Sequence, residues 1–110
     1  MSLAVMCSAF SAEGHARIGS AEPPADAVLT VPPPAIAITF TEKIEPWFSA
    51  IEIRNEKGER VGGVSAQTVS DRTLSIAPGH LDPGKYTVTW RVLSVDTHKS
   101  EGTYAFTITP

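Results

Sequence analysis

The chain has 110 residues, a length that fits one domain with a single, modest hydrophobic core. Its formal net charge is -3 and its lysines and arginines are scattered, so we do not expect nucleic acid as a partner. No apolar run approaches the length of a membrane span, so we do not expect a membrane-inserted protein. The one cysteine, Cys7, cannot form a disulfide within the chain.

The first element in chain order is a predicted leader over residues 1–14. Residues 3–10 are apolar and rich in small side chains, like the end of a signal-peptide core. Ala12 and Gly14 place small residues where a cut before His15 requires them, and a cut after Ser11 is the alternative. No positive charge precedes the apolar stretch, so a simple disordered tail is the other interpretation. We expect export, with a mature domain over residues 15–110.

From Ile18 onward the pattern is typical of half-buried strands, because apolar and polar residues alternate with period two. Weaker strand candidates are residues 28–31, 60–69 and 73–76. The alternating apolar residues are Ile36, Ile38 and Phe40; Ile51 and Ile53; Tyr86, Val88, Trp90 and Val92; and Tyr104, Phe106 and Ile108.

Turn residues separate these runs. Residues 56–59 indicate a hairpin turn in which Gly58 takes positive φ, and residues 42–49 have room for one short turn of helix. About seven short strands at this spacing predict an all-β, immunoglobulin-like β-sandwich. Trp90 is expected to anchor the core. Trp47 covers either an end of the fold or a functional site, and the sequence favours neither.

Asp96 and His98 stand two positions apart and are candidate metal ligands. If the backbone there is extended, both side chains leave the same face, and oxygen and imidazole donors suit Cu(II), Ni(II) or Zn(II). Taken alone, the pair is more typical of a solvated loop. As a mature N-terminus, His15 would add its α-amine and imidazole, and three nitrogens with one oxygen match the tetragonal preference of Cu(II). Because the amine must lose a proton to bind, affinity should fall in acid.

Other chemistry is poorly supported. The sequence lacks a G-x-S-x-G nucleophile elbow, an H-E-x-x-H or C-x-x-C motif and a glycine-rich phosphate loop. His80 is interpreted as an exposed loop histidine without a neighbouring ligand. Glu42 and Glu45 either reach the site or are solvated.

Several segments in order resemble the CopC family of periplasmic copper-resistance proteins. The resemblance covers residues 15–110. It is carried by HARI at 15–18, SAEPPAD at 20–26, ITFTEKIEP at 38–46 and GKYTVTWRVLSVDTHKSEG at 84–102.

This resemblance implies a small Greek-key β-sandwich in the periplasm that carries or sequesters copper and is not an enzyme. It implies a Cu(II) site made by His15 as the mature N-terminus, Asp96 and His98, with Glu42 as a secondary candidate. It also implies an inner-membrane CopD-type partner. Some members have a methionine-rich loop for Cu(I), but here Met1 and Met6 both precede the expected cut, so a thioether Cu(I) site is not expected.

Two other functions remain open from the sequence. An N-terminal histidine that chelates copper is also used by copper-dependent oxidative enzymes, although few aromatic residues are available here for a substrate-binding face. The second is a metal-free, immunoglobulin-like interaction module, because the sandwich fold by itself carries no function.

Overall fold

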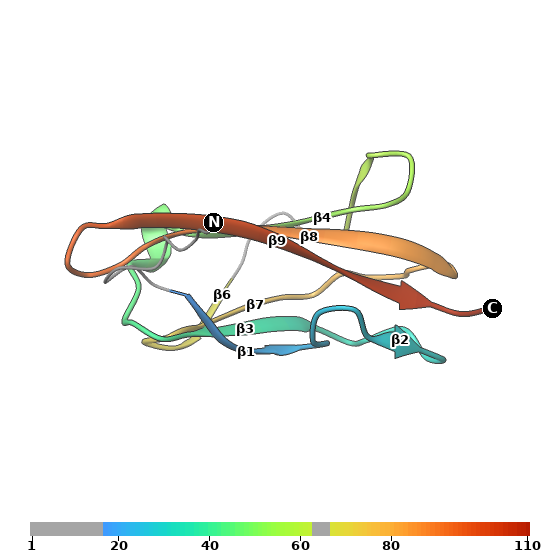
Figure 1. Ribbon diagram of the computed structural model, residues 1–110, viewed down its shortest axis with the longest axis horizontal. Helices are drawn as coiled ribbons and strands as arrows, with labels where there is room; N and C mark the ends of the chain where they lie inside the picture. The colour runs from blue at the N-terminus through green and yellow to red at the C-terminus, as the bar shows by residue number, and fades with distance from the viewer. Residues whose placement is uncertain (1–16, 63–66) are drawn as a thin grey trace, which may run out of the picture.

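Strands dominate residues 17–62 and 67–110, the part of the chain that the computed structural model describes (Figure 1). A single 3-10 turn, η2 (Pro46–Phe48), interrupts the strands of this part. The strands are β1 (Ile18–Glu22), β2 (Val28–Leu29), β3 (Ile36–Phe40), β4 (Ala50–Arg54), β5 (Arg60–Val61), β6 (Gln67–Ser70), β7 (Thr73–Ile76), β8 (Gly84–Leu93) and β9 (Lys99–Ile108).

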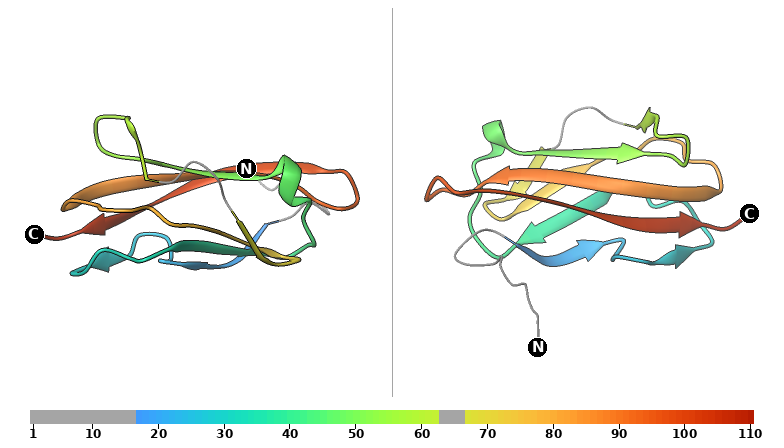
Figure 2. Two further views of the ribbon diagram at one scale, coloured as in Figure 1. Left: turned by 180° about the vertical axis from the view of Figure 1, so that it is seen from behind. Right: turned by 45° about the horizontal axis from the view of Figure 1, so that its top comes forward.

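These strands form two sheets that pack face to face, which confirms the predicted all-β sandwich (Figure 2). The four-stranded sheet has the order β1-β3-β7-β6, and the five-stranded sheet has the order β2-β9-β8-β4-β5. The long β8–β9 hairpin is the centre of the larger sheet, with Gly84 opposite Ile108 and Leu93 opposite Lys99. Its turn therefore lies at one end of the sandwich.

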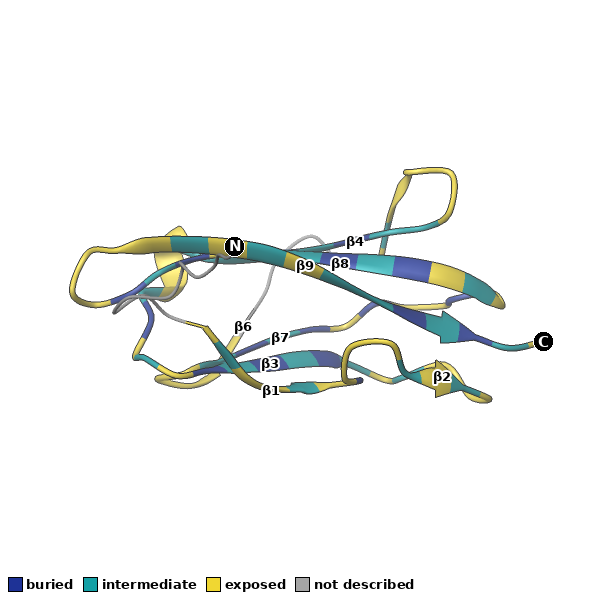
Figure 3. Ribbon diagram, in the orientation of Figure 1, coloured by how far each residue is buried: buried dark blue, intermediate teal, exposed yellow. Residues whose placement is uncertain are grey.

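The core lies between the sheets, where alternate residues of β3, β4, β7, β8 and the end of β9 are buried (Figure 3). Ile36, Ile38 and Phe40 of β3 face Trp90 and its neighbours on β8. The rings of Phe40 and Trp90 meet edge to face, with centroids 5.2 Å apart. Trp90 is only 8% exposed, as expected for a core anchor.

The element count differs slightly from the predicted seven or so strands. Two of the nine described strands, β2 and β5, have two residues each, and the weak candidate over residues 60–69 contains all of β5 and the first three residues of β6. The short helical turn expected within residues 42–49 is η2. Among the described residues, no helix has the length and apolar character needed to cross a membrane.

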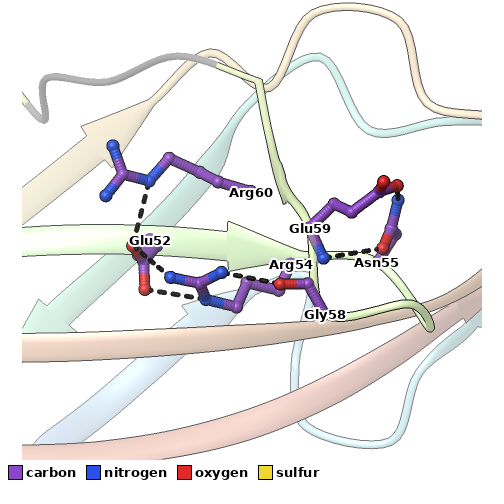
Figure 4. A network of polar contacts seen from close by, with 6 residues as sticks. All are labelled: Glu52, Arg54, Asn55, Gly58, Glu59 and Arg60. Atoms are coloured by element: carbon purple, nitrogen blue, oxygen red, sulfur yellow. Dashed lines mark hydrogen bonds and ion pairs between the residues drawn. The ribbon is translucent and has the colours of Figure 1, made fainter.

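A polar network on the outer face joins β4 to β5 (Figure 4). Glu52 accepts hydrogen bonds from Arg54 Nε at 3.2 Å and Arg60 Nε at 3.0 Å. Desolvation acts to raise the pKa of Glu52, but the hydrogen bonds and charges of Arg54 and Arg60 together lower it. Gly58 takes a φ of 82° in the connecting turn, as the sequence predicts.

Candidate metal site

Asp96 and His98 lie in the turn that joins β8 to β9, at the end of the sandwich (Figure 1). The turn is closed by two backbone hydrogen bonds, from Ser94 N to His98 O at 2.9 Å and from Thr97 N to Ser94 O at 2.9 Å. Thr97 has a left-handed φ of 74°. The backbone is therefore not extended here, whereas the sequence analysis assumes an extended backbone. A tight turn, rather than strand geometry, brings the two side chains together.

The two candidate ligands are close to each other. Asp96 Oδ1 lies 3.3 Å from His98 Nδ1, and the two side chains are 51% and 54% exposed. Two donors about 2.0 Å from a metal and at right angles to each other are about 2.8 Å apart. The pair is thus near the spacing of adjacent ligands in a square-planar site, and solvent can reach it.

Ser94 holds the Asp96 carboxylate in place, and sequence reasoning did not single it out. Ser94 is fully buried. Its Oγ donates a hydrogen bond to Asp96 Oδ1 and accepts one from the His98 backbone N–H at 3.3 Å. The hydrogen bond from Ser94, followed by the interactions with His98, holds the pKa of Asp96 below its usual value, although desolvation opposes them. This keeps Asp96 ionised, the form that binds metal.

The segment that contains Glu42 lies beside this turn. Ile44 forms a bridge with Ser94, Val95 N donates to Lys43 O at 3.0 Å and Glu45 N donates to Leu93 O at 2.8 Å. Glu42 itself is half-buried. Within residues 17–62 and 67–110, no group of three His, Cys, Asp or Glu side chains is arranged to hold a metal. Among the described residues, Asp96 and His98 therefore form a candidate pair, and no third side chain of these types is grouped with them.

His15 and the predicted leader over residues 1–14 lie outside the described residues. The start of the described chain is nevertheless anchored near the site. Arg17 N donates to Thr41 Oγ1 at 3.1 Å, and Thr41 N donates to Arg17 O at 2.8 Å. Thr41 directly precedes Glu42, so the chain enters β1 at the end of the sandwich that carries the β8–β9 turn (Figure 2).

A second histidine–aspartate pair lies at the other end of β8. His80 Nε2 is 2.8 Å from Asp82 Oδ1, and both side chains are more than four-fifths exposed. The expectation that His80 has no neighbouring ligand was therefore wrong, because the chain before Pro83 places the Asp82 carboxylate beside the His80 ring. This pair has the same donor types and two-residue spacing as Asp96 and His98, but no buried serine in the described part of the chain donates a hydrogen bond to its carboxylate.

Comparisons with known proteins agree with this fold along nearly the whole chain. A family model described as the CopC domain matches residues 18–109. Copper resistance protein C of Escherichia coli is 31% identical over 116 residues, covering 94% of this chain and 89% of that protein. Protein YobA of Escherichia coli strain K12 is 38% identical over 97 residues, covering 86% of this chain and 78% of that protein.

Solved structures of related proteins have the same fold. The crystal structure of CopC from Methylosinus trichosporium OB3b superimposes with a TM-score of 0.83 at 33% identity, covering 87% of this chain and 95% of that chain. PcoC from Escherichia coli, described as a methionine-rich copper resistance protein, superimposes with a TM-score of 0.76 at 29% identity, covering 87% of this chain and 100% of that chain.

Proposed function

Because the chain belongs to the CopC family of copper-resistance proteins, we propose that it binds one Cu(II) ion in the periplasm and sequesters or carries it. Asp96 Oδ1 and His98 supply one oxygen and one nitrogen. His15, as the mature N-terminus, supplies its α-amine and its imidazole. The protein acts as a carrier rather than an enzyme, and an inner-membrane CopD-type protein is the proposed recipient.

The observation that carries this proposal is the 3.3 Å approach of Asp96 Oδ1 to His98 Nδ1 in an exposed turn. The hydrogen bonds of Arg17 support the role of His15. Arg17, only two positions after His15 in the sequence, is paired with Thr41, which directly precedes the segment beside the β8–β9 turn. The ligand set contains no sulfur, and nitrogen with oxygen suits Cu(II) better than Cu(I).

Removal of single ligands tests the site. In protein that begins at His15, we expect His98→Ala to weaken Cu(II) binding by about 100-fold, or about 2.7 kcal/mol. Asp96→Ala should weaken it less, because imidazole is the stronger donor. Affinity is measured by competition with a chelator, and the ligand set by electron paramagnetic resonance. The matched control is the double variant His80→Ala/Asp82→Ala, which removes the other pair and should leave both measurements unchanged.

The N-terminus is tested by comparing protein that begins at His15 with protein that begins at Met1. In the longer chain the α-nitrogen of His15 is part of a peptide bond, so one donor and its chelate ring are lost. We expect affinity to fall by at least about tenfold. Equal affinities of the two chains would show that the α-amine is not a ligand, and an unchanged affinity in His98→Ala would refute the site itself.

Two other outcomes would favour the alternative functions. Absence of any copper binding would favour a metal-free module, and oxidation of a polysaccharide with ascorbate and peroxide would favour an enzyme.

Oxidation state provides a separate prediction. Residues 15–110 contain neither methionine nor cysteine, because Met1, Met6 and Cys7 all lie in the predicted leader. Cu(I) selects soft sulfur ligands, so reduction with ascorbate should transfer copper to a competing Cu(I) chelator. The measurement is the fraction of copper left on the protein after gel filtration. Retention of Cu(I) against the chelator would contradict this prediction.

A further inference from the structure

Two large aromatic side chains project into solvent from η2. Trp47 is 91% exposed and Phe48 is 71% exposed, and η2 contains no buried residue. Trp47 therefore covers neither an end of the sandwich nor the candidate metal site. Aromatic residues of this size normally contribute to cores or interfaces, so two adjacent exposed ones indicate a surface that binds a partner.

The turn that carries these aromatics is firmly attached to β8. Glu45 N donates to Leu93 O at 2.8 Å. Ser49 Oγ donates to Glu45 O at 2.8 Å and accepts from Leu93 N at 3.2 Å. These bonds fix both ends of η2 against the end of the strand. The aromatic surface is thus preorganised, which lowers the entropy that a partner would have to overcome on binding.

A pocket of about 500 Å³ lies next to Phe48 on the outer face of the five-stranded sheet. Leu93 contributes apolar surface, and Arg91, Lys99 and Glu101 contribute charge. Leu93 is paired with Lys99 and Arg91 with Glu101 across the β8–β9 hairpin. The pocket therefore combines an aromatic wall with two cations and one carboxylate.

The two cations of this pocket, Arg91 and Lys99, differ from the other arginines of the outer face in their ion pairing. On the same outer face Arg54 and Arg60 are both paired with Glu52 (Figure 4). No ion pair within residues 17–62 and 67–110 involves Arg91 or Lys99. The pocket contains one more cation than carboxylate and has an aromatic wall, so it suits a ligand that carries both carboxylates and apolar side chains.

We propose that Trp47, Phe48, Arg91, Leu93 and Lys99 form a docking surface for an acidic, apolar segment of a partner protein. This inference rests on the proposed function, because Leu93 precedes Ser94 and Lys99 follows His98. A docked segment would lie beside the copper ligands and place the partner for transfer of the ion.

The test uses copper-free, isotope-labelled protein that begins at His15 and two capped peptides. One peptide alternates glutamate with leucine and phenylalanine, and the other has lysine in place of each glutamate. We expect only the acidic peptide to shift the amide resonances of residues 91–93 and 99–101. The double variant Arg91→Glu/Lys99→Glu should reverse this preference. Trp47→Ser/Phe48→Ser should weaken acidic-peptide binding by about tenfold.

The control variant is Val28→Ser/Val69→Ser, which removes two exposed apolar side chains elsewhere and should leave peptide binding unchanged. Equal responses to both peptides, or no effect of charge reversal, would overturn the proposal. So would concentration-dependent shifts without peptide, which would indicate a second copy of the chain. Binding to vesicles of phosphatidylethanolamine and phosphatidylglycerol without peptide shifts would indicate a membrane instead. An unchanged Cu(II) affinity in Trp47→Ser/Phe48→Ser separates this surface from the copper site.

Discussion

At the scale of single residues, Ser94 is the group that contacts both candidate ligands. It contacts Asp96 through a side-chain hydrogen bond and His98 through the backbone, although it is fully buried itself. Residues that hydrogen-bond to metal ligands and orient them typically contribute one to two orders of magnitude in metal affinity. Ser94 thus links the buried end of β8 to the two exposed candidate ligands.

Replacement of Ser94 by alanine removes the hydroxyl that holds Asp96 and leaves the His98 N–H without that acceptor. We expect Ser94→Ala to weaken Cu(II) binding by about tenfold and to lower the free energy of unfolding by about 1–2 kcal/mol. Chelator competition and urea unfolding measure the two effects. Thr97→Ala is the matched control, because the Thr97 hydroxyl bonds the Asp96 backbone rather than its carboxylate. Equal affinities of Ser94→Ala and the parent protein would show that Asp96 needs no support.

The site was only partly predictable at this scale. The two-residue spacing made Asp96 and His98 visible as a candidate pair, and their proximity is confirmed. The spacing could not show the turn, which depends on the left-handed φ of Thr97 and on backbone bonds between Ser94 and His98. It could not show the role of Ser94 either, because the sequence does not distinguish a buried serine beside a loop from an exposed one.

At the scale of elements, β9 contains a glycine that the packing of the hairpin requires. Gly102 is paired with Trp90 across the β8–β9 ladder. A Cβ at this position would lie 2.6 Å from Trp90 Cζ2 and 2.9 Å from Cε2. The indole ring therefore occupies the space that a side chain at position 102 would fill, and its edge-to-face contact with Phe40 depends on that placement.

Gly102→Ala should force the Trp90 ring out of this position. We expect the free energy of unfolding to fall by about 1–3 kcal/mol, as overpacked cores commonly show. Urea unfolding followed by tryptophan fluorescence measures the loss. Gly58→Ala is an informative comparison, since nothing lies within 4 Å of its Cβ position and its cost would come from positive φ alone. A more stable Gly102→Ala variant would mean that the core has room that the structure does not show.

Strand prediction succeeded where one face of a strand is buried. Alternation in residues 36–40 and 84–92 follows directly from burial of every second side chain. The two-residue strands β2 and β5 carry too short a pattern, and their existence depends on the partners that they pair with, Thr107 and Ile108 for β2 and Ile53 and Arg54 for β5. Their sequences therefore predicted only the weak strand candidates over residues 28–31 and 60–69.

At the scale of the whole molecule, the pKa of Tyr104 depends on the packing of the two sheets against each other. Its hydroxyl is buried and has no hydrogen-bond partner among the described residues. Burial, followed by the negative charge of Glu22 on β1, raises the pKa of Tyr104 to about 12. Because Glu22 belongs to the other sheet, this raised pKa exists only when the sandwich is assembled.

The raised pKa predicts how stability depends on pH in strong base. An unfolded tyrosine ionises near its ordinary pKa of about 10, whereas folded Tyr104 keeps its proton up to about pH 12. Its contribution to stability is therefore complete below pH 10 and is lost as the pH rises from 10 towards 12. Tyr104→Phe cannot ionise and should lack this loss, so the stability of the parent relative to the variant should decrease over that interval.

Urea unfolding of both proteins at pH 8, 10 and 11 measures the difference in stability, and the effect of lysine titration cancels because it is common to both proteins. At pH 8 the variant should be at least as stable as the parent, since it removes a buried hydroxyl without a partner. Parallel stability profiles for the two proteins would show that Tyr104 titrates normally and that the sheets do not shield it.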